Sequence, residues 1–200
     1  LIVDDNEDGA ASLATLLQLS GHETHTAHDG LGALEAAERL GHVDTLQPPF
    51  SAIRRDALAA ELPWCLAHDT GVIVYSPMQS GLLTGLFTEA RATALATDDW
   101  RSRSPEFQSP RLQNNLALAE AFRPIATRYD TTVGAIAVAW TLATPGVTGA
   151  IVGARSATQV DGWIAAAELD LTTADLTEVA SAIERTGAGT GPLAAPSGMT

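Results

Sequence analysis

Residues 71–85 read Gly-Val-Ile-Val-Tyr-Ser-Pro-Met-Gln-Ser-Gly-Leu-Leu-Thr-Gly and hold the clearest strand signal in the chain. The run Val72–Tyr75 is apolar and rich in β-branched residues, and it lies between Gly71 and Pro77. This pattern predicts a short buried strand, because central strands of parallel sheets are apolar on both faces. The stretch therefore favours an α/β fold.

The rest of the chain alternates predicted strands with predicted helices. Further strands are expected at residues 1–3, 22–27, 43–47 and 148–153. Apolar residues at helical spacing predict helices that are capped by Asn6, Asp29, Thr132, Ser156 and Thr172, the helix capped by Ser156 running on to Ile164. Two more are expected at residues 62–68 and at 112–129, the second interrupted by Pro124. Such alternation predicts parallel βα units. Five strands suit an open doubly wound sheet, since a complete eight-unit barrel needs about 250 residues.

Composition and charge exclude several classes of protein. The 200 residues include 11 Lys plus Arg against 24 Asp plus Glu, a formal net charge of −13, which argues against nucleic-acid and anionic-membrane partners. The one cysteine, Cys65, excludes an internal disulfide and a multi-cysteine metal site. No apolar run approaches the roughly 20 residues of a membrane helix. The acidic start at residues 4–8 is unlike a secretory signal, so a cytoplasmic location is expected.

The first 40 residues resemble the receiver domain of response regulators. The resemblance rests on Leu1-Ile-Val-Asp-Asp-Asn-Glu-Asp8, on Leu-Gln-Leu-Ser-Gly-His-Glu at 17–23 and on Ala-His-Asp-Gly at 27–30. It implies two flavodoxin-like βα units and a weak, vestigial Mg²⁺ site at Asp4 and Asp5, because adjacent carboxylates are suitable ligands for a hard cation. The family's phosphoacceptor Asp has no counterpart between Thr45 and Arg55.

Residues from about 41 to 190 resemble the second half of an aldo-keto reductase. The matching motifs are Gln47-Pro-Pro-Phe-Ser51, Pro63-Trp-Cys65, the stretch 71–85, Asp99-Trp-Arg-Ser-Arg103 and Gly149-Ala-Ile-Val-Gly-Ala-Arg-Ser156 with Gln159. The resemblance implies strands six to eight of a (β/α)₈ barrel and the half of the enzyme that holds NADP(H). The expected fold class is thus α/β, a partial barrel half joined to two flavodoxin-like units.

The same resemblance implies a role for each matching residue. Gln47 would hydrogen-bond the nicotinamide carboxamide, and Tyr75 would stack on the nicotinamide ring, although a buried strand aromatic is the alternative for Tyr75. Arg155, just before a helix, would bind a 2′-phosphate and so favour NADP(H) over NAD(H). The complete set of implied cofactor residues is Gln47, Tyr75, Ser76, Met78, Ser80, Gly81, Leu82, Gly153, Arg155 and Gln159.

The chain also departs from the family pattern. Leu86 stands where many relatives have a lysine, and Gly162-Trp163 replaces a Glu-Asn pair that holds adenine. The family's catalytic Asp, Tyr, Lys and His belong to the first half of the barrel, and this chain contains no lysine. No catalytic residue is therefore assigned. The chain is expected to keep the cofactor half of an NADP(H)-dependent carbonyl reductase, and whether it is an enzyme is left open.

Two alternatives to this function stay open: a non-catalytic receiver-like signalling module, and a fusion without native activity. A small carbonyl compound is an expected partner only if the missing half is supplied, and self-association is left open.

The expected domains are 1–40, 41–186 and a disordered tail at 187–200. The run Gly187–Gly191 is similar to a dinucleotide-binding fingerprint, but it follows a helix and is therefore assigned to the tail.

Residues 80–110 form a long polar stretch, of the kind that is functional or mobile. Within it, Asp98, Asp99, Arg101 and Arg103 fit a solvated loop and a cofactor-covering lid equally well. The histidines 22, 25 and 28 lack further ligands at suitable spacing and are assigned to a surface strand.

Overall fold

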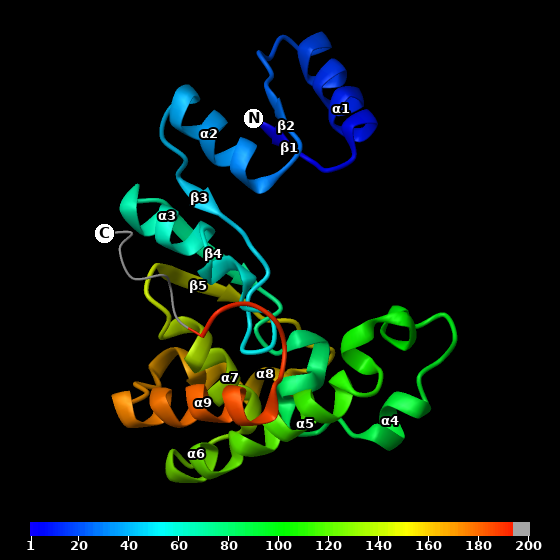
Figure 1. The fold of residues 1–200 in the computed structure, drawn as a ribbon, viewed down its shortest axis with the longest axis vertical. Helices are drawn as coiled ribbons and strands as arrows, with labels where there is room; N and C mark the ends of the chain where they lie inside the picture. Colours follow the sequence, from blue (N-terminus) through cyan, green and yellow to red (C-terminus); the bar gives the residue numbers. More distant parts are fainter. Residues whose placement is uncertain (194–200) are drawn as a thin grey trace. The chain divides into compact units, whose positions relative to one another are not determined.

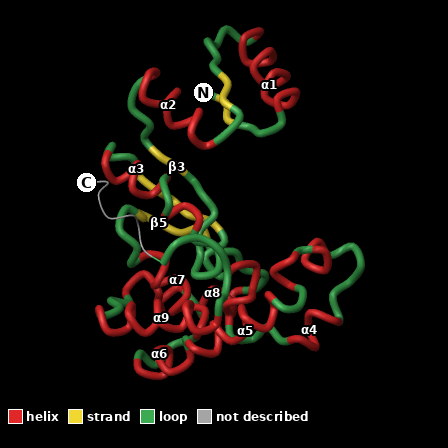
Figure 2. Tube along the Cα trace, in the orientation of Figure 1, coloured by secondary structure: helices red, strands yellow, loops and turns green. Residues whose placement is uncertain are grey.

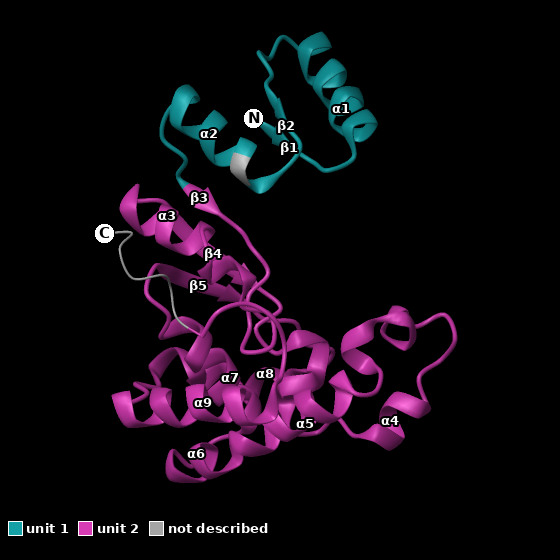
Figure 3. Cartoon of the chain, in the orientation of Figure 1, with its two compact units in different colours: residues 1–44 teal, residues 45–200 magenta. Residues whose placement is uncertain are grey.

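The computed structural model describes residues 1–193, apart from the side chain of Leu31. The chain divides into two compact units, residues 1–44 and the residues from Thr45 onward (Figure 3). Each unit has its own sheet, so the five predicted strands form two sheets rather than one open doubly wound sheet. Among the described residues, no helix is long and apolar enough to cross a bilayer.

The first unit is a parallel βαβ unit followed by a second helix. Strands β1 (Ile2–Val3) and β2 (Thr26–Ala27) pair in parallel and are connected by α1 (Glu7–Leu19), and α2 (Gly30–Leu40) follows. The predicted caps form, because the Asn6 side chain accepts the Gly9 N–H at 2.9 Å and the Asp29 side chain accepts the Gly32 N–H at 2.6 Å. Both helices therefore begin where the sequence predicts.

The second unit contains a three-stranded parallel sheet. Its strands are β3 (Thr45–Leu46), β4 (Gly71–Tyr75) and β5 (Val147–Ile151), in the order β3-β4-β5. The strands predicted at 43–47, 72–75 and 148–153 are confirmed in place and direction, with boundaries that differ by a few residues. Together with β1 and β2, they establish an α/β fold with parallel strands.

Helices of the second unit cover one face of this sheet and continue beyond it (Figure 1). Helix α7 (Val133–Leu142) is buried from Val133 to Thr141 and packs against β5. Helix α5 (Arg111–Ala121) lies beside α9 (Thr173–Thr186). Residues 112–129 form two helices, which confirms the predicted interruption near Pro124: the first helix ends at Ala121, and the second begins at Arg123, one residue before the proline. The α-helices are α3 (Glu61–Ala67), α4 (Glu89–Thr93), α5 (Arg111–Ala121), α6 (Arg123–Arg128), α7 (Val133–Leu142), α8 (Ala157–Asp161) and α9 (Thr173–Thr186).

Residues 80–110 are more ordered than their polar composition predicts (Figure 2). The segment from residue 79 contains α4 and the 3₁₀ helices Gln79–Thr84, Trp100–Arg103 and Pro105–Phe107. Phe107 packs edge-on against Phe87, with ring centroids 5.3 Å apart, and against Trp100 at 6.0 Å. Phe87 and Phe107 belong to the main hydrophobic core, so these contacts anchor the segment to the second unit.

Two predictions are wrong, one about the ends of α8 and one about the C-terminal segment. Ser156 stands at the N-cap of α8 but makes no capping hydrogen bond, and the helix ends at Asp161 instead of continuing to Ile164, which begins the 3₁₀ helix Ile164–Glu168. The predicted disordered tail does not hold for residues 187–193, where Thr190 pairs with Arg54 and Ala188 is 1% exposed. The remainder of that predicted tail, 194–200, lies outside the described residues.

Candidate functional site

The carboxyl ends of β3, β4 and β5 bring the predicted cofactor residues to one edge of the sheet. Gln47 directly follows β3, Tyr75 is the last residue of β4, and Gly153 lies two residues beyond β5. Tyr75 pairs with Ile151 on one side and forms a bridge with Pro49 on the other. Because ligands of open α/β sheets bind beyond the carboxyl ends of the strands, this edge is the candidate site.

Tyr75 presents its ring on the open face of the sheet. Side chains alternate along β4, so Val72 and Val74 are fully buried, whereas Ile73 and Tyr75 are 38% and 39% exposed. The backbone of Tyr75 is fixed, since its N–H donates to Pro48 O and its carbonyl accepts the Phe50 N–H, both at 3.1 Å. The alternative of a buried strand aromatic is therefore wrong, and the ring is accessible to a ligand.

The loop after Tyr75 has an unusual backbone. Ser76, Gln79, Ser80 and Gly81 all have positive φ, at 60°, 44°, 53° and 103°. Such strained positions cluster at ligand-binding sites. Within the loop, the N–H groups of Gln79 and Gly81 donate to the carbonyl oxygens of Ser76 and Met78, at 2.9 and 3.1 Å. A Cβ built on Gly81 would meet no atom within 4 Å, so the backbone faces open space there. The Leu82 side chain is fully buried, which leaves only its backbone for a ligand.

The segment after β5 carries an exposed arginine, Arg155. Arg155 and Gln159 are both exposed, and Gln159 Oε1 accepts the Arg155 N–H at 2.7 Å, which fixes the turn between them. Within the part of the chain that the structure describes, no ion pair or hydrogen bond engages the Arg155 guanidinium. A Cβ built on Gly153 would also meet nothing within 4 Å. The turn therefore offers an unpaired cation beside open space.

Asp99 lies close enough to this arginine for their charges to interact. Arg101 binds the Asp99 carboxylate through two nitrogens, with Nη2–Oδ2 at 2.6 Å and Nε–Oδ1 at 3.0 Å. The hydrogen bonds from Arg101 lower the pKa of Asp99 to about 2, and the charge of Arg155 contributes. Asp99 and Arg101 thus form a half-buried ion pair near the candidate site, whereas Asp98 and Arg103 are exposed.

The acidic pair of the first unit has little support as a metal site. Asp4 uses one carboxylate oxygen, Oδ1, to accept the Asn6 N–H at 2.9 Å, and Asp5 is exposed. Among the described residues, no group of three or more His, Cys, Asp or Glu side chains is placed to hold a metal ion. The same search of the described residues included the histidines. His25 Nε2 lies 3.5 Å from Glu23 Oε1, and His28 Nδ1 contacts the carbonyl oxygen of Asp4.

The second tyrosine of the chain has a structural role that the sequence did not indicate. Tyr129 Oη donates to Asp175 Oδ2 at 2.7 Å, and Arg128 Nη2 donates to Asp175 Oδ1 at 2.5 Å. The hydrogen bond to Asp175, followed by burial, raises the pKa of Tyr129. A phenol so held is a poorer proton donor, and its contacts join α6 to α9. Tyr129 is therefore part of the scaffold.

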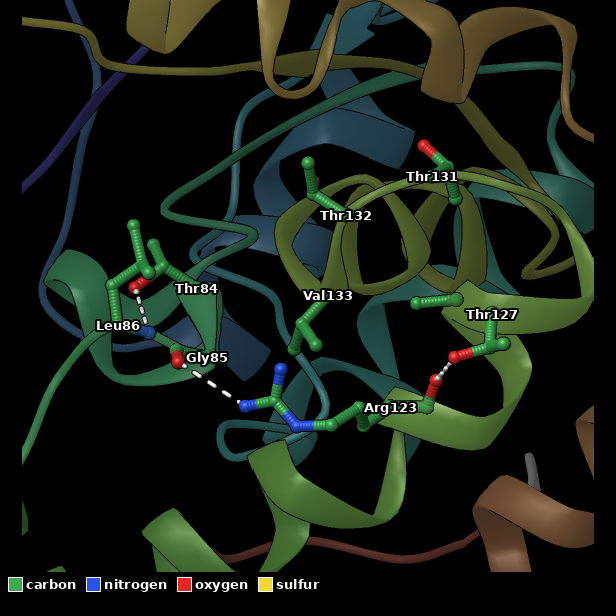
Figure 4. A pocket seen from close by; sticks show the side chains of 9 residues that line it. Thr84, Gly85, Leu86, Arg123, Thr127, Thr131, Thr132 and Val133 are labelled. Carbon is green, nitrogen blue, oxygen red and sulfur yellow. Dashed lines mark hydrogen bonds between the residues drawn. The ribbon is translucent and has the colours of Figure 1, made fainter.

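A cavity of about 290 Å³ lies between the end of the loop after β4 and the start of α7 (Figure 4). Its polar walls are mainly threonines, and Arg123 crosses it to donate to Gly85 O at 3.4 Å. Arg123 is also paired with Glu120, so it carries no free charge. Leu86, which replaces the lysine of many relatives, stands on the rim and is 76% exposed. None of the predicted cofactor residues lines this cavity.

Comparisons with known proteins agree with the geometry. The model of the Aldo/keto reductase family matches residues 27–184. The NADH-specific methylglyoxal reductase of Escherichia coli (strain K12) is 32% identical over 150 residues, covering 74% of this chain and 45% of that protein. Aldo-keto reductase YhdN of Bacillus subtilis (strain 168) is 31% identical over 154 residues, covering 76% and 46%. The structure of glycerol dehydrogenase AKR11B4 from Gluconobacter oxydans has a TM-score of 0.75 at 27% identity, covering 95% of this chain and 59% of that one.

These matches set the extent of the resemblance. The chain spans about half the length of the curated relatives it matches. The family match begins at Ala27 and includes α2, so the predicted boundary near residue 41, which assigned α2 to the receiver-like fragment, is wrong. A receiver relationship for the residues before Ala27 stays a prediction. On the family match and the similarity to the two reductases, the chain belongs to the aldo/keto reductase family.

Proposed function

We propose that the second unit binds a nicotinamide dinucleotide along the carboxyl ends of β3, β4 and β5. The observation that carries this proposal is the parallel sheet, which brings three separate sequence segments to one edge: Gln47, the loop from Tyr75 to Leu82, and the turn from Gly153 to Gln159. These groups suit such a ligand, because they combine an amide, an accessible aromatic ring, a loop with strained backbone and a guanidinium that has no partner among the described residues.

Each part of the edge has a distinct role in this proposal. The exposed Gln47 amide offers both a donor and an acceptor to the nicotinamide carboxamide. The ring of Tyr75 covers one face of the nicotinamide. Ser76, Met78, Ser80, Gly81 and Leu82 line the pyrophosphate through the strained loop. When bound, the cofactor supplies the hydride for reduction of a carbonyl compound.

The preference for NADP(H) rests on Arg155. A guanidinium recognises phosphate through several directed hydrogen bonds, and Arg155 has no other partner among the described residues. The relative from Escherichia coli is named NADH-specific, so family membership alone does not decide between the two cofactors. We propose NADP(H) for this chain on the strength of that free cation.

Carbonyl reduction itself needs groups that this chain does not offer. The chain has no lysine, and it has two tyrosines, of which Tyr75 is given to stacking and Tyr129 is bound to Asp175. We propose that a small carbonyl substrate is reduced only where the catalytic groups of the family are supplied in addition. Alone, the chain would act as a cofactor-binding half.

Titration of NADPH and NADH, followed by tryptophan fluorescence, tests this function. Arg155→Ala is expected to weaken NADPH binding about tenfold or more, since a charge-assisted contact contributes roughly 1.5–3 kcal/mol, and to leave NADH binding unchanged. Tyr75→Ala should weaken both cofactors equally. Arg185→Ala, which removes an exposed arginine from α9, is the matched control. Equal losses of both cofactors in Arg155→Ala would refute the phosphate contact, and no binding by the parent chain would refute the function.

A further inference from the structure

The segment after α9 returns to the loop that follows β3. We call residues 187–193 the C-terminal strap and residues 47–56 the β3 loop; both are visible in Figure 1. The two pair through the backbone, since Thr190 N–H donates to Ile53 O at 2.8 Å and Arg55 N–H donates to Thr190 O at 3.0 Å. Thr190 Oγ1 also donates to Asp56 Oδ2 at 2.9 Å. Residues more than 130 positions apart are thereby joined.

The side chain of Arg55 fastens the same two segments. It is 4% exposed, and its hydrogen bonds go to backbone carbonyl oxygens on both sides. Nη1 donates to Ala52 O in the β3 loop and to Ala188 O in the strap at 3.2 Å. Nη2 and Nε donate to the carbonyls of Gly191 and Pro192 at 3.3 and 3.2 Å. A buried charge requires such compensation, and the forked guanidinium supplies enough donors for all four acceptors.

Two glycines allow this close approach. Gly189 and Gly191 have φ of +69° and +87°, values that favour glycine. A Cβ on Gly189 would overlap the carbonyl oxygen of Ile53, and a Cβ on Gly191 would overlap the carbonyl carbon of Arg55. The run Gly187–Gly191 is therefore explained by backbone packing rather than by a dinucleotide fingerprint or by disorder.

The β3 loop also contacts the candidate cofactor edge. The buried Ser51 hydroxyl accepts the N–H groups of Ile53 and Arg54, at 3.2 and 3.0 Å, and donates to Gln79 Oε1 at 3.1 Å. The N–H of Phe50 donates to the Tyr75 carbonyl. The loop is thus held on one side by the strap and on the other by the strand and loop that carry the proposed ligand contacts.

We propose that Arg55 is a positioning residue: it fixes the C-terminal strap to the β3 loop and so holds Gln47 and Tyr75 in the arrangement that binds the dinucleotide. Arg55 does not itself touch the ligand. The effect on ligand binding rests on the function proposed above, whereas the joining of strap and loop does not.

Hydrogen exchange of the whole chain without cofactor tests the joining directly. Arg55→Gln is compared with Arg54→Gln, which removes the same charge from the same loop. Arg54 is exposed, and no side-chain hydrogen bond or ion pair of Arg54 occurs among the described residues. Peptides containing Phe50, Arg55 and Thr190 should exchange on the order of tenfold to a hundredfold faster in Arg55→Gln, and at the parent rate in Arg54→Gln. Unchanged exchange in Arg55→Gln would overturn the proposal.

A pair of glycine variants tests the same contact if Arg55→Gln does not fold. Gly189→Ala places a methyl group against Ile53 O, whereas Gly187→Ala introduces similar backbone strain, at φ +62°, with no heavy atom nearer than 3.7 Å. Gly189→Ala should reproduce the faster exchange of the β3 loop, and Gly187→Ala should not. Equal exchange in the two variants would overturn the role of the strap.

Titration with NADPH and NADH then tests positioning. Arg55→Gln should weaken both cofactors by about tenfold, because the loop serves the nicotinamide end that the two share. Faster exchange with unchanged affinity would overturn the positioning role. If the parent binds neither cofactor, the proposed function fails, and the exchange data still decide whether Arg55 joins strap and loop.

Discussion

Loss of the buried Asp175 carboxylate should destabilise the second unit. It is 4% exposed and accepts hydrogen bonds from Thr172 N–H and Thr172 Oγ1, at 2.9 and 2.6 Å, from Tyr129 and from Arg128. Asp175→Ala removes half of a capping box, a loss of about 1 kcal/mol. The substitution also removes the buried acceptor of Tyr129 and Arg128. Tyr129 keeps Asp170 O as an acceptor and Arg128 keeps Glu178, so each lost hydrogen bond should lower the free energy of unfolding by only about 1 kcal/mol.

The expected total is about 3 kcal/mol, or a fall in Tm of about 6–12 °C for a unit of this size. Urea denaturation followed by tryptophan fluorescence measures it, and all four tryptophans, at 64, 100, 140 and 163, report on the second unit alone. Glu178→Gln is the control, because it removes only an exposed partner of Arg128 and should change stability by less than about 0.5 kcal/mol. A loss below about 1 kcal/mol in Asp175→Ala, or an equal loss in Glu178→Gln, would refute the reasoning.

The pH dependence of this stability has a definite sign. Hydrogen bonds from Thr172, and then from Tyr129 and Arg128, hold the pKa of Asp175 well below its usual range, against the opposing effect of burial. A carboxylate whose pKa is lower in the folded state stabilises that state above its unfolded pKa, near 3.9, and loses this effect as pH falls toward the folded value. The stability difference between the parent and Asp175→Asn should therefore be constant above about pH 5 and shrink below about pH 4.

Three further outcomes are expected. Incubation with a small phosphodonor and Mg²⁺ should give no aspartyl phosphate in residues 1–55 by mass spectrometry, because the acceptor carboxylate is missing between Thr45 and Arg55. The purified chain should not oxidise NADPH in the presence of nitrobenzaldehyde, since each positioned proton donor contributes roughly 10²–10⁴-fold and the family's catalytic groups are absent from it. Burial, with a smaller effect of Glu61, raises the pKa of Cys65 to about 11, so iodoacetamide should label it at least about 10²-fold more slowly in the folded chain than in urea at pH 8.

The features that the sequence predicted correctly are those with local causes. Asn6, Asp29, Thr132 and Thr172 each accept an N–H three residues ahead, so their effect is contained within one helical turn. The strand at Val72–Tyr75 is likewise predicted by the apolar, β-branched residues that it contains. Ser156 fails as a cap because its hydroxyl contacts Thr158 Oγ1, a competing short-range bond that the pattern alone does not reveal.

The residues of the candidate site stay a prediction, and their exposure could not be predicted from the sequence. Resemblance to the family identified Tyr75, yet an apolar strand run is equally consistent with a ring in the core. The register decides this, because Val72 and Val74 take the covered face and leave Tyr75 on the open one. Similarly, no spacing rule reports that Arg101 binds the carboxylate of Asp99, whose charge interacts with that of Arg155.

In the C-terminal strap, amino-acid composition alone did not predict the observed order. A run of glycine, alanine and proline lacks the apolar surface to order itself, which is the reason for expecting disorder. In this chain the ordering energy comes from elsewhere: the carbonyl oxygens of Ala188, Gly191 and Pro192 accept hydrogen bonds from the guanidinium of a buried arginine, and two glycines let the backbones approach. Because that arginine lies 133–137 residues away in sequence, the order of the strap is a property of the folded unit and not of the segment, and a peptide of the same sequence should be unstructured.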